Sequence, residues 1–457
     1  MKNQNTIKTL FSAGVLVLTS MTMLSCGNTE EKQDNSETKK EAAPVKIKTS
    51  SALVFAELLN RDEKLSQDEF EKIKSKFTAN KNKFNKDNTD YTSLLKVVEV
   101  YIYEARVTGE HPHYYSAALT TLNWMLEQES SINKDQKFNA LFYKSTVLLS
   151  QHKFNEALEI GELALAMNDK NSGIYGVLVD ANVEIGNYEE AVKMSDKMMA
   201  MRPDLRSYSR VSYLREIYGD NAGAKQAMIT AVKTGDPISE YTCWGLKTLG
   251  EIYESEGKLD SAATCYEITL ERRANYPFGI AGLARIASKK GNTTEALKLY
   301  GEALAILPEI GFNIDVANLK KKEGTLVDEA ATIAEIETMF QEDIESGHNM
   351  SLEYAGFLAE FKGDYAQALT LAKEELVNRP KNIDVNKQIA FIYYKQGNME
   401  EAQKHLTIAQ ATNKTDAEMK CLEGLITKDA TLVKASFDLN PYQNHLALSD
   451  AKKIIKA

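Results

Sequence analysis

The chain has 457 residues, of which 43% are hydrophobic and 26% charged, and its formal net charge is -10. This composition is normal for a folded protein, and the length allows several domains or one long array of repeats. No block of the sequence is strongly basic, so the electrostatic footprint of nucleic-acid binding is missing and no nucleic-acid partner is expected.

The first 25 residues have the pattern of a secretion signal. Lys2 and Lys8 precede an apolar core of fourteen residues, 10–23, which is too short to cross a membrane as a helix. The next residues, "MLSCG", resemble the lipobox of bacterial lipoproteins. This resemblance implies a signal peptide over 1–25 and lipidation of Cys26. The alternative is an ordinary secretory signal in which the cysteine occurs by chance.

The segment 26–50 differs in composition from the rest of the chain. After Cys26 it contains no aromatic residue and balances five acidic residues with five lysines. Such a segment buries too little apolar surface to fold, and we expect a disordered tether that spans roughly 25–30 Å. Together with the lipobox, it predicts a protein anchored by lipid in the cell envelope, at the outer membrane of a Gram-negative bacterium. The sequence leaves open whether the protein faces the periplasm or the cell surface.

A repeat follows residues 51–88, which are helical in composition but poorly patterned. A turn-like stretch such as "GNYEEA" or "GKLDSA" recurs, and each copy ends in an alanine. These alanines are Ala157, Ala191, Ala224, Ala262, Ala296, Ala330, Ala368 and Ala402. Successive members are 34, 33, 38, 34, 34, 38 and 34 residues apart. A period of 34 with helix–turn–helix content is the signature of tetratricopeptide repeats.

Other positions agree with this period. A proline follows the alanine by twelve residues at Pro203, Pro308 and Pro380. The chain therefore resembles the tetratricopeptide-repeat family, and the resemblance implies an all-α fold, a right-handed α-solenoid of about eight or nine units over 89–415. We expect an N-terminal helical cap over 51–88 and a shortened unit with a C-terminal cap over 416–457, because the ends of a solenoid must cover an apolar face.

Three stretches depart from the regular unit. The stretch "GEHPHYYSA" predicts a longer loop ahead of Ala118 in a divergent first unit. The two 38-residue steps predict longer connections at about 233–241 and 341–350, and both of these stretches are polar. The unit at 311–330 has a weakly patterned first helix, which we expect to be shortened.

No arrangement of residues points to catalysis. GxSxG, GxGxxG, GxxxxGK[ST] and HExxH are all absent, so we expect neither enzyme activity nor a cofactor. His111 and His113 are the only close pair of histidines, and two imidazoles without further ligands do not complete a metal site. Cys243, Cys265 and Cys421 are expected to be three buried thiols, with one disulfide and one free thiol as the alternative.

A row of arginines is the most suggestive feature for binding. Arg206 and Arg210 share one helical face. They match the positions that carry basic residues in tetratricopeptide proteins with a carboxylate clamp, and this resemblance implies an acidic peptide terminus as ligand. Phe142 and Thr146 stand where that clamp needs lysine and asparagine. The alternative is that the arginines pair with acids of neighbouring helices.

The concave surface is the usual binding face of this family, and the first helix of each unit lines it. Exposed aromatic residues among charges there would mark a groove for a protein or peptide. The predicted partner-binding residues are Arg206, Arg210, Tyr213, Trp244, Lys247, Phe278, Arg285, Phe357, Phe391 and Tyr394. The alternative for each aromatic residue is a place in the core.

The sequence thus predicts a non-catalytic, lipid-anchored envelope scaffold that binds a protein or peptide partner in its groove. The alternative function is a surface lipoprotein that captures a ligand for a nutrient uptake system.

Overall fold

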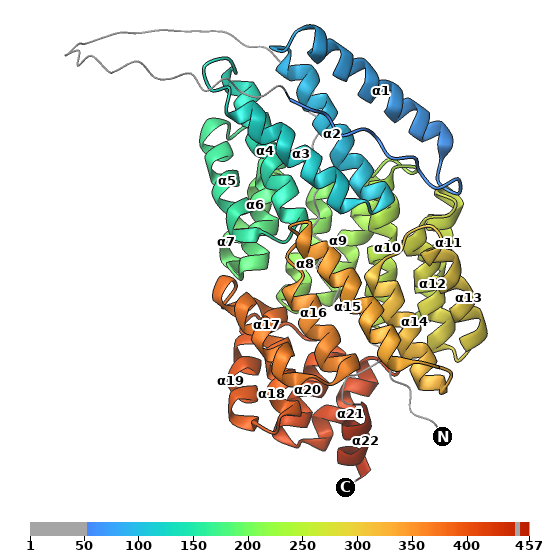
Figure 1. Cartoon of the computed structure of the whole chain (residues 1–457). Helices are drawn as coiled ribbons and strands as arrows, with labels where there is room; N and C mark the ends of the chain where they lie inside the picture. The colour runs from blue at the N-terminus through green and yellow to red at the C-terminus, as the bar shows by residue number, and fades with distance from the viewer. Residues whose placement is uncertain (1–52, 444–447, 457) are drawn as a thin grey trace, which may run out of the picture.

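The computed structural model of the chain describes residues 53–443 and 448–456 (Figure 1). The signal peptide, the tether and Cys26, predicted for the first 50 residues, lie outside this range. Within the described range the secondary structure is helical and contains no strand.

The first eleven helices are α1 (Gln67–Lys86), α2 (Tyr91–Thr108), α3 (His111–Leu126), α4 (Lys134–Ser150), α5 (Phe154–Met167), α6 (Ser172–Ile185), α7 (Tyr188–Met201), α8 (Leu205–Ile217), α9 (Asn221–Thr234), α10 (Glu240–Ser255) and α11 (Leu259–Arg272). The remaining helices are α12 (Pro277–Lys289), α13 (Thr293–Leu304), α14 (Ile310–Glu323), α15 (Glu329–Glu345), α16 (Ser351–Phe357), the π-helical segment η1 (Leu358–Lys362), α17 (Tyr365–Asn378), α18 (Ile383–Lys395), α19 (Met399–Ala409), α20 (Ala417–Thr427), α21 (Ala430–Leu439) and α22 (Leu448–Lys456).

Consecutive helices pack as antiparallel pairs, and each pair is one repeat unit (Figure 1). Unit 1 is α2 with α3, unit 2 is α4 with α5, and the series continues to unit 10, which is α20 with α21. Helix α1 precedes the first unit and α22 follows the last. The architecture is therefore the all-α, right-handed solenoid that the 34-residue period predicts.

Unit 3 shows how local chemistry builds the pair. The chain reverses at Gly186, whose φ of +92° is easily adopted only without a Cβ. Ala191, five residues later, has 0% exposure, so α6 and α7 approach closely there. The next unit begins at Asp204, whose carboxylate accepts hydrogen bonds from the backbone N–H groups of Arg206 and Ser207. These two bonds satisfy N–H groups that have no acceptor inside the helix.

Two local expectations are wrong. The connection between α2 and α3 is only two residues long, because Pro112 lies in the first turn of α3, where its missing N–H is not needed. Helix α14 has 14 residues, as many as α6. Its apolar pattern is weak because Asp315 and Asn318 are buried together with the apolar side chains around them.

The repeat register also fails at Ala330, which is exposed in the first turn of α15. The helix buries Ile336 and Phe340 instead, since the extra residue in "GTLVDEA" shifts the buried face. The longer connections predicted at 233–241 and 341–350 are also wrong, because the linkers after α9 and α15 occupy 235–239 and 346–350 and are no longer than the linker 305–309. Most of the extra residues lengthen α10 and α15 instead.

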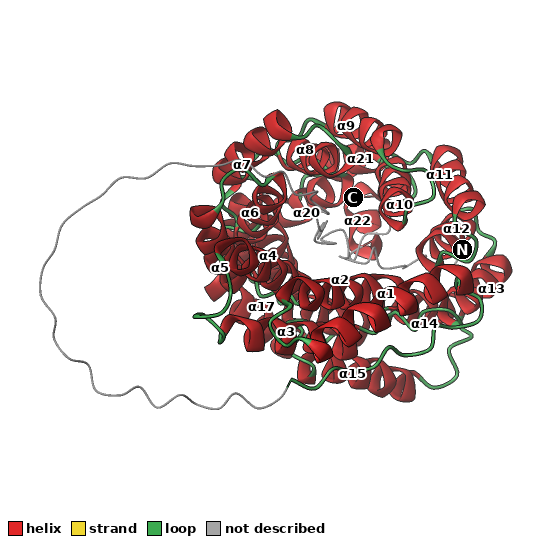
Figure 2. Ribbon diagram, turned by 90° about the horizontal axis from the view of Figure 1, so that it is seen from above, coloured by secondary structure: helices red, strands yellow, loops and turns green. Residues whose placement is uncertain are grey.

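The solenoid winds through more than one full turn, so units far apart in sequence stack on one another. Figure 2, seen from above, shows the helices arranged in a ring. We call units 1–6 (91–304) the first superhelical turn and units 7–10 (310–439) the second, whose later units lie below the first in Figure 1.

The two superhelical turns meet in a regular register. The hairpins of units 2, 3 and 4 contact the linkers that precede units 8, 9 and 10, and the hairpin of unit 5 contacts the linker that precedes α22. In the bonds that mark this register, Asn349 N–H donates to Gln151 O (3.0 Å), Asn382 Nδ2 to Glu184 O (2.9 Å), Asn221 Nδ2 to Thr415 O (2.9 Å) and Asn440 Nδ2 to Glu254 O (3.1 Å). Each bond joins residues nearly two hundred positions apart, so about six units complete one circuit.

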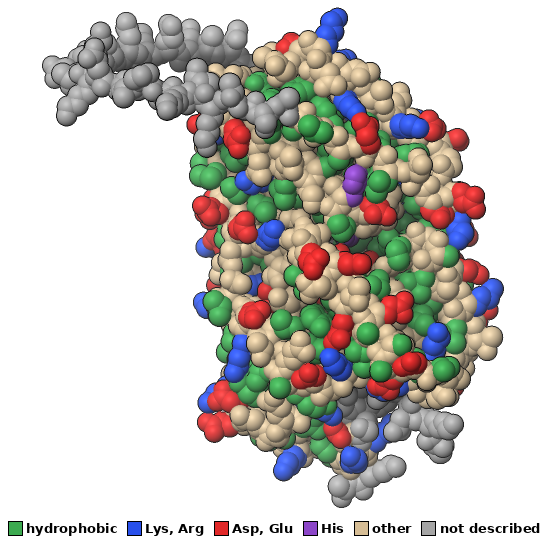
Figure 3. Space-filling view, viewed as in Figure 1, with side chains coloured by type: hydrophobic (Ala, Val, Ile, Leu, Met, Phe, Trp, Pro, Cys, Tyr) green, Lys and Arg blue, Asp and Glu red, His purple; other side chains and the backbone are tan. Residues whose placement is uncertain are grey.

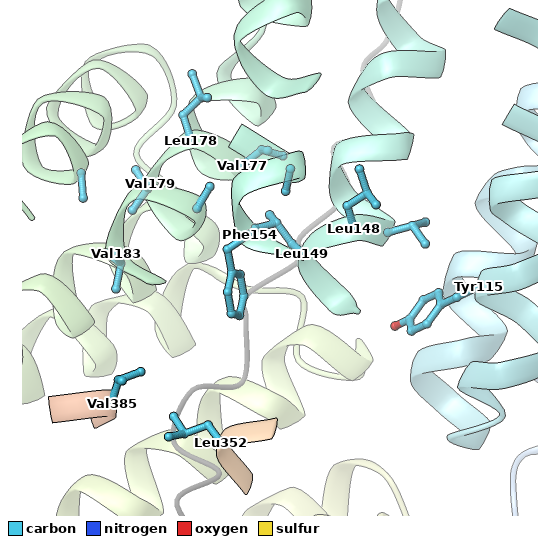
Figure 4. Close-up of a cluster of buried hydrophobic side chains, with 14 of the residues drawn as sticks. Tyr115, Leu148, Leu149, Phe154, Val177, Leu178, Val179, Val183, Leu352 and Val385 are labelled. Atoms are coloured by element: carbon cyan, nitrogen blue, oxygen red, sulfur yellow. The ribbon is translucent and has the colours of Figure 1, made fainter. Parts of the chain in front are cut away.

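The contact at unit 3 is charged as well as hydrogen-bonded. Arg379 Nη1 lies 3.0 Å from Glu184 Oε2, and both side chains are buried. The backbone N–H of Ile383 donates to Tyr188 Oη at 2.9 Å. Apolar packing continues across the same boundary: Figure 4 shows Phe154 and Val183 of the first superhelical turn in one cluster with Leu352 and Val385 of the second. The superhelix is therefore closed on itself by a shared core.

Candidate functional site

The outer face drawn in Figure 3 interleaves acidic, basic and apolar side chains, and this mixture indicates no class of partner. The feature that stands out is internal. A cavity of about 620 Å³ lies on the concave side of the ring. Its wall comes mainly from the first helices of units 3–7 (α6, α8, α10, α12 and α14), and α18 with residues 414–418 completes it from the second superhelical turn. The stacking of the two superhelical turns thus creates the enclosure.

Six of the ten residues predicted to bind a partner lie on this wall. They are Arg210, Tyr213, Trp244, Lys247, Phe278 and Arg285. Each comes from α8, α10 or α12, so the expectation that first helices line the concave surface places these side chains together. Their role in binding remains a prediction.

The other four lie elsewhere. Phe357 and Phe391 are 2% and 3% exposed and belong to the hydrophobic core; the ring of Phe357 packs 5.9 Å from that of Phe340. Tyr394 is partly buried against the core. Arg206 lies over the ring of Tyr241, 5.3 Å from its centre, and does not line the cavity.

Arg210 contacts an acid of the preceding unit. Its guanidinium binds both carboxylate oxygens of Asp180, at 2.9 and 2.6 Å, and is 3% exposed. Arg202, in the linker between α7 and α8, pairs with Asp204 two residues later. The pair of Arg210 with Asp180 is the one expected if the arginines serve to hold neighbouring helices together.

One end of the cavity is aromatic. Trp244 on α10 and Phe278 on α12 are partly exposed to it, and Phe312 on α14 packs edge-to-face with Phe278 at a ring distance of 5.7 Å. The ammonium of Lys247 lies 5.7 Å from the ring centre of Trp244 and 6.0 Å from that of Phe278. Rings and charge therefore alternate on this wall, as at many protein-binding surfaces.

Behind the rings runs a buried network of ion pairs. Glu254 accepts hydrogen bonds from Arg285 Nη2 at 3.0 Å and from Tyr266 Oη at 2.5 Å, and it pairs with Lys289. Burial alone would raise the pKa of Glu254, but Arg285 and Lys289 hold it at about 2. This carboxylate is fully charged at neutral pH and fixes the wall of α10 against that of α12.

Two further acids on the wall, Glu309 and Asp315, were not identified from the sequence. Asp315 is 2% exposed and accepts a hydrogen bond from Tyr300 Oη at 2.7 Å. Burial raises its pKa to about 6. Burial, reinforced by the charge of Asp343, raises the pKa of Glu309 to about 7. In the sequence the only signal for Asp315 was its place in the apolar stretch "GFNIDVAN". That stretch resembles a weakly patterned helix and does not indicate a polar cavity wall.

The described residues contain no cluster of metal ligands, and their cysteine thiols are buried. Among residues 53–443 and 448–456, no three His, Cys, Asp or Glu side chains are arranged to hold a metal ion. Cys243, Cys265 and Cys421 are free and buried, as expected, and burial raises the pKa of each thiol to about 11. Thiols in that state are poor nucleophiles.

Comparison of the sequence with protein families gives two matches. Both family models are described as "Tetratricopeptide repeat"; one matches residues 280–312 and the other residues 362–426. The matched segments include α12 with α13, and α17 through most of α20. No curated protein sequence matches the chain.

Several solved structures are similar in fold. The human IFIT1 dimer with PPP-AAAA is 13% identical, with 71% of this chain and 73% of that chain covered and a TM-score of 0.46. The Cut9–Hcn1 hetero-tetramer of APC/C is 11% identical, with coverage of 85% and 94% and a TM-score of 0.37. PilF of Pseudomonas aeruginosa is 16% identical, with coverage of 50% and 99% and a TM-score of 0.36. Similarities of this size concern the fold alone.

Proposed function

The chain belongs to the tetratricopeptide-repeat family, and we propose that it is a non-catalytic scaffold that holds a segment of a partner protein in the cavity. The fold of this family is typically that of a protein-interaction scaffold. The observation that carries the proposal is the cavity itself, with a volume of about 620 Å³ and with aromatic rings and charged groups on its wall.

The size of the cavity limits what it can hold. Its volume lies within the roughly 300–1,000 Å³ of typical ligand sites. That volume accommodates several side chains of an extended segment but not a folded domain. Partly exposed Trp244 and Phe278 supply large apolar contact area, and aromatic side chains of this kind dominate the energy of many protein contacts.

The proposal includes a lipid anchor at Cys26, followed by a tether, at the outer membrane of a Gram-negative bacterium. The lysines, the apolar core and the "MLSCG" sequence at the N-terminus support it. No helix of the described residues has the length and apolar character needed to span a bilayer. In this proposal the lipid holds the solenoid at the membrane, and the cavity recruits the partner to it.

The binding part is tested by pull-down of the full chain from envelope extracts. Phe278→Leu and Trp244→Ala each change the wall, whereas Tyr218→Ala removes an exposed aromatic residue outside the cavity. We expect the partner recovered by the wild type to be lost or depleted with both wall variants and kept with Tyr218→Ala. Phe278→Leu keeps an apolar side chain at the site, so it separates loss of the ring from loss of folding. An identical set of partners for all chains would refute the proposal.

The anchor is tested by membrane fractionation of cells that express Cys26→Ser. The expected result is release of the protein from the membrane fraction, because no lipid can then be attached. Retention of the variant at the membrane would contradict the anchor but not the role of the cavity.

A further inference from the structure

The wall of the cavity carries more acidic than basic side chains. Among the described residues that line it, ten are Asp or Glu and seven are Lys or Arg. A recess with walls of low dielectric constant focuses the field of such a surplus, which attracts cations and repels anions.

All seven cations on the wall are engaged within the chain. Arg210 lies 2.6 Å from Asp180, Lys247 lies 2.8 Å from Glu251, and Arg285 lies 3.0 Å from Glu254. Lys258, Lys289, Lys387 and Lys414 also form ion pairs with acids of this chain. An anionic ligand would have to displace one of these partners. The acidic peptide terminus implied by the arginine row could not bind Arg210 freely, because the guanidinium of Arg210 already binds Asp180.

Unlike these cations, two carboxylates on the same wall, Glu309 and Asp315, form no ion pair with any residue that the structure describes. Oδ1 of Asp315 is buried and has no hydrogen-bond partner, while Oδ2 is held by Tyr300. The charge of Lys247 acts on Glu309, but that ammonium is already held by Glu251. Burial raises the pKa values of Glu309 and Asp315, and for Asp315 it outweighs the charges of Arg285 and Lys289, which act in the opposite direction.

The aromatic end of the cavity adjoins these carboxylates. Phe312 lies between Glu309 and Asp315 on α14, and its ring contacts Phe278. The ammonium of Lys247 already lies near the rings of Phe278 and Trp244, so this aromatic surface accommodates a cation. A lysine or arginine side chain has both properties that the wall matches, an apolar stem for the rings and a charged head for a carboxylate.

From this juxtaposition of partly exposed aromatic rings and carboxylates that form no ion pair among the described residues, we infer that the occupant of the cavity is a basic segment of the partner. One of its lysine or arginine side chains lies along Phe278 and binds Glu309. The inference rests on the proposed function and narrows the chemistry of the partner.

The test compares labelled peptides of equal length in which the same positions are Lys, Gln or Glu. Binding to the purified chain is measured by fluorescence anisotropy, and spermidine serves as the free cation in competition. We expect the lysine peptide to bind at least about tenfold more tightly than the other two, a difference of one charge-assisted contact. Added salt should weaken the lysine peptide most.

Glu309→Gln is the matched variant, since it removes the charge and keeps the shape. It should weaken the lysine peptide about tenfold and leave the glutamine peptide unchanged. Glu302→Gln, on the exposed side of α13, is the control and should change neither affinity.

The outcomes separate this inference from the proposed function. Equal or tighter binding of the glutamate peptide would overturn the basic segment and leave the scaffold standing. Binding of the lysine peptide that Glu309→Gln does not weaken would overturn the assigned contact. Binding of spermidine with no binding of any peptide, in a chain that also recovers no partner by pull-down, would overturn both.

Discussion

The hairpins of the two superhelical turns have the same backbone conformation, but their surroundings differ. Gly186 in the first and Gly397 in the second have φ of +92° and +79°. A Cβ on Gly186 would lie 2.6 Å from the carbonyl carbon of Lys381, whereas a Cβ on Gly397 would meet nothing within 4 Å. Gly219 resembles Gly186, because a Cβ there would lie 2.5 Å from the carbonyl oxygen of Asn413. A glycine with positive φ ends the helix in both places, but only the missing Cβ of Gly186 leaves room for the backbone of another unit.

This difference shows where the closed form of the molecule comes from. In a simple solenoid each unit contacts only its sequence neighbours. Here units six apart also share hydrogen bonds, an ion pair and a core. The hairpins of units 2–5 are therefore covered by the second superhelical turn, whereas those of the second superhelical turn, such as the one at Gly397, form an open edge. The cavity depends on this stacking, since Lys387 and residues 414–418 of the second superhelical turn complete its wall. Changes at the contact between the two superhelical turns should therefore cost more than matched changes at the open edge.

The largest effect is expected for Arg379→Met. The change leaves Glu184 across the contact and Glu375 of α17 buried without their partner, and removing one member of a buried pair typically costs about 3–5 kcal/mol. Urea unfolding measures the loss. Arg215→Ala is the control, because Arg215 and Asp220 are both 50% exposed and such pairs contribute at most about 1 kcal/mol. Equal losses for the two variants would refute a stabilising contact between the superhelical turns.

Gly186→Ala should follow, at about 2–5 kcal/mol. It combines about 1–2 kcal/mol for a left-handed conformation with about 1–3 kcal/mol for forcing a methyl group against backbone. Gly397→Ala carries the first cost alone, because the space around it is open. The same unfolding experiment compares them, and a Gly186→Ala loss no greater than that of Gly397→Ala would show that the linker does not lie there.

Acid should weaken a third point of contact between the two superhelical turns. His111, His152 and His348 meet where the hairpin of unit 2 touches the linker 346–350, with ring centres 4.5 Å apart for His152 and His348 and 6.2 Å apart for His111 and His348. Both ring nitrogens of His348 are buried without a hydrogen bond. Burial, with the charges of His152 and Arg106, lowers the pKa of His111 to about 4, and burial lowers that of His348 as well.

The sign follows from where protons bind. Between about pH 6.5 and pH 4 the unfolded chain holds a proton on His111 that the folded chain does not, so stability falls as pH falls. For His111 the loss is about 2 kcal/mol at pH 5. Asp343 and Glu353 also face the cluster. Burial raises the pKa of Asp343 to about 6, which acts in the opposite direction. The measurement is therefore the difference between the wild type and His111→Gln at pH 7 and pH 5. An identical pH dependence would contradict the assignment.

The repeat itself could be predicted because it is a local signal. Alanines such as Ala191 recur at one period and are buried, and glycines such as Gly186 recur at the turns, where the positive φ of the hairpin favours glycine. The stacking of the two superhelical turns could not be predicted in this way. It joins Asn382 to Glu184 with no periodic signal, since the circuit length depends on small rotations between successive units.

The candidate site could likewise be predicted only where helical spacing within one unit determines the position of a side chain. Trp244 and Phe278 were expected on the concave wall because helical spacing places them there, and they lie there. The same spacing placed Phe357 and Phe391 on the wall, but packing in the second superhelical turn buries both. Glu309 was missed because it lies at a junction between units, outside the first-helix positions that the repeat singles out.

Hydrogen exchange at the amide of Ile383 tests the contact between the superhelical turns most directly. Ile383 is the first residue of α18, so its N–H has no partner within the helix and donates instead to Tyr188 Oη, 2.9 Å away. Tyr188→Phe removes that bond, at a cost of about 1 kcal/mol. A second superhelical turn stacked on the first predicts slow exchange at Ile383 in the wild type and fast exchange in Tyr188→Phe, with the interior amides of α18 unchanged. Fast exchange at Ile383 in the wild type would contradict the stacking and the closed cavity with it.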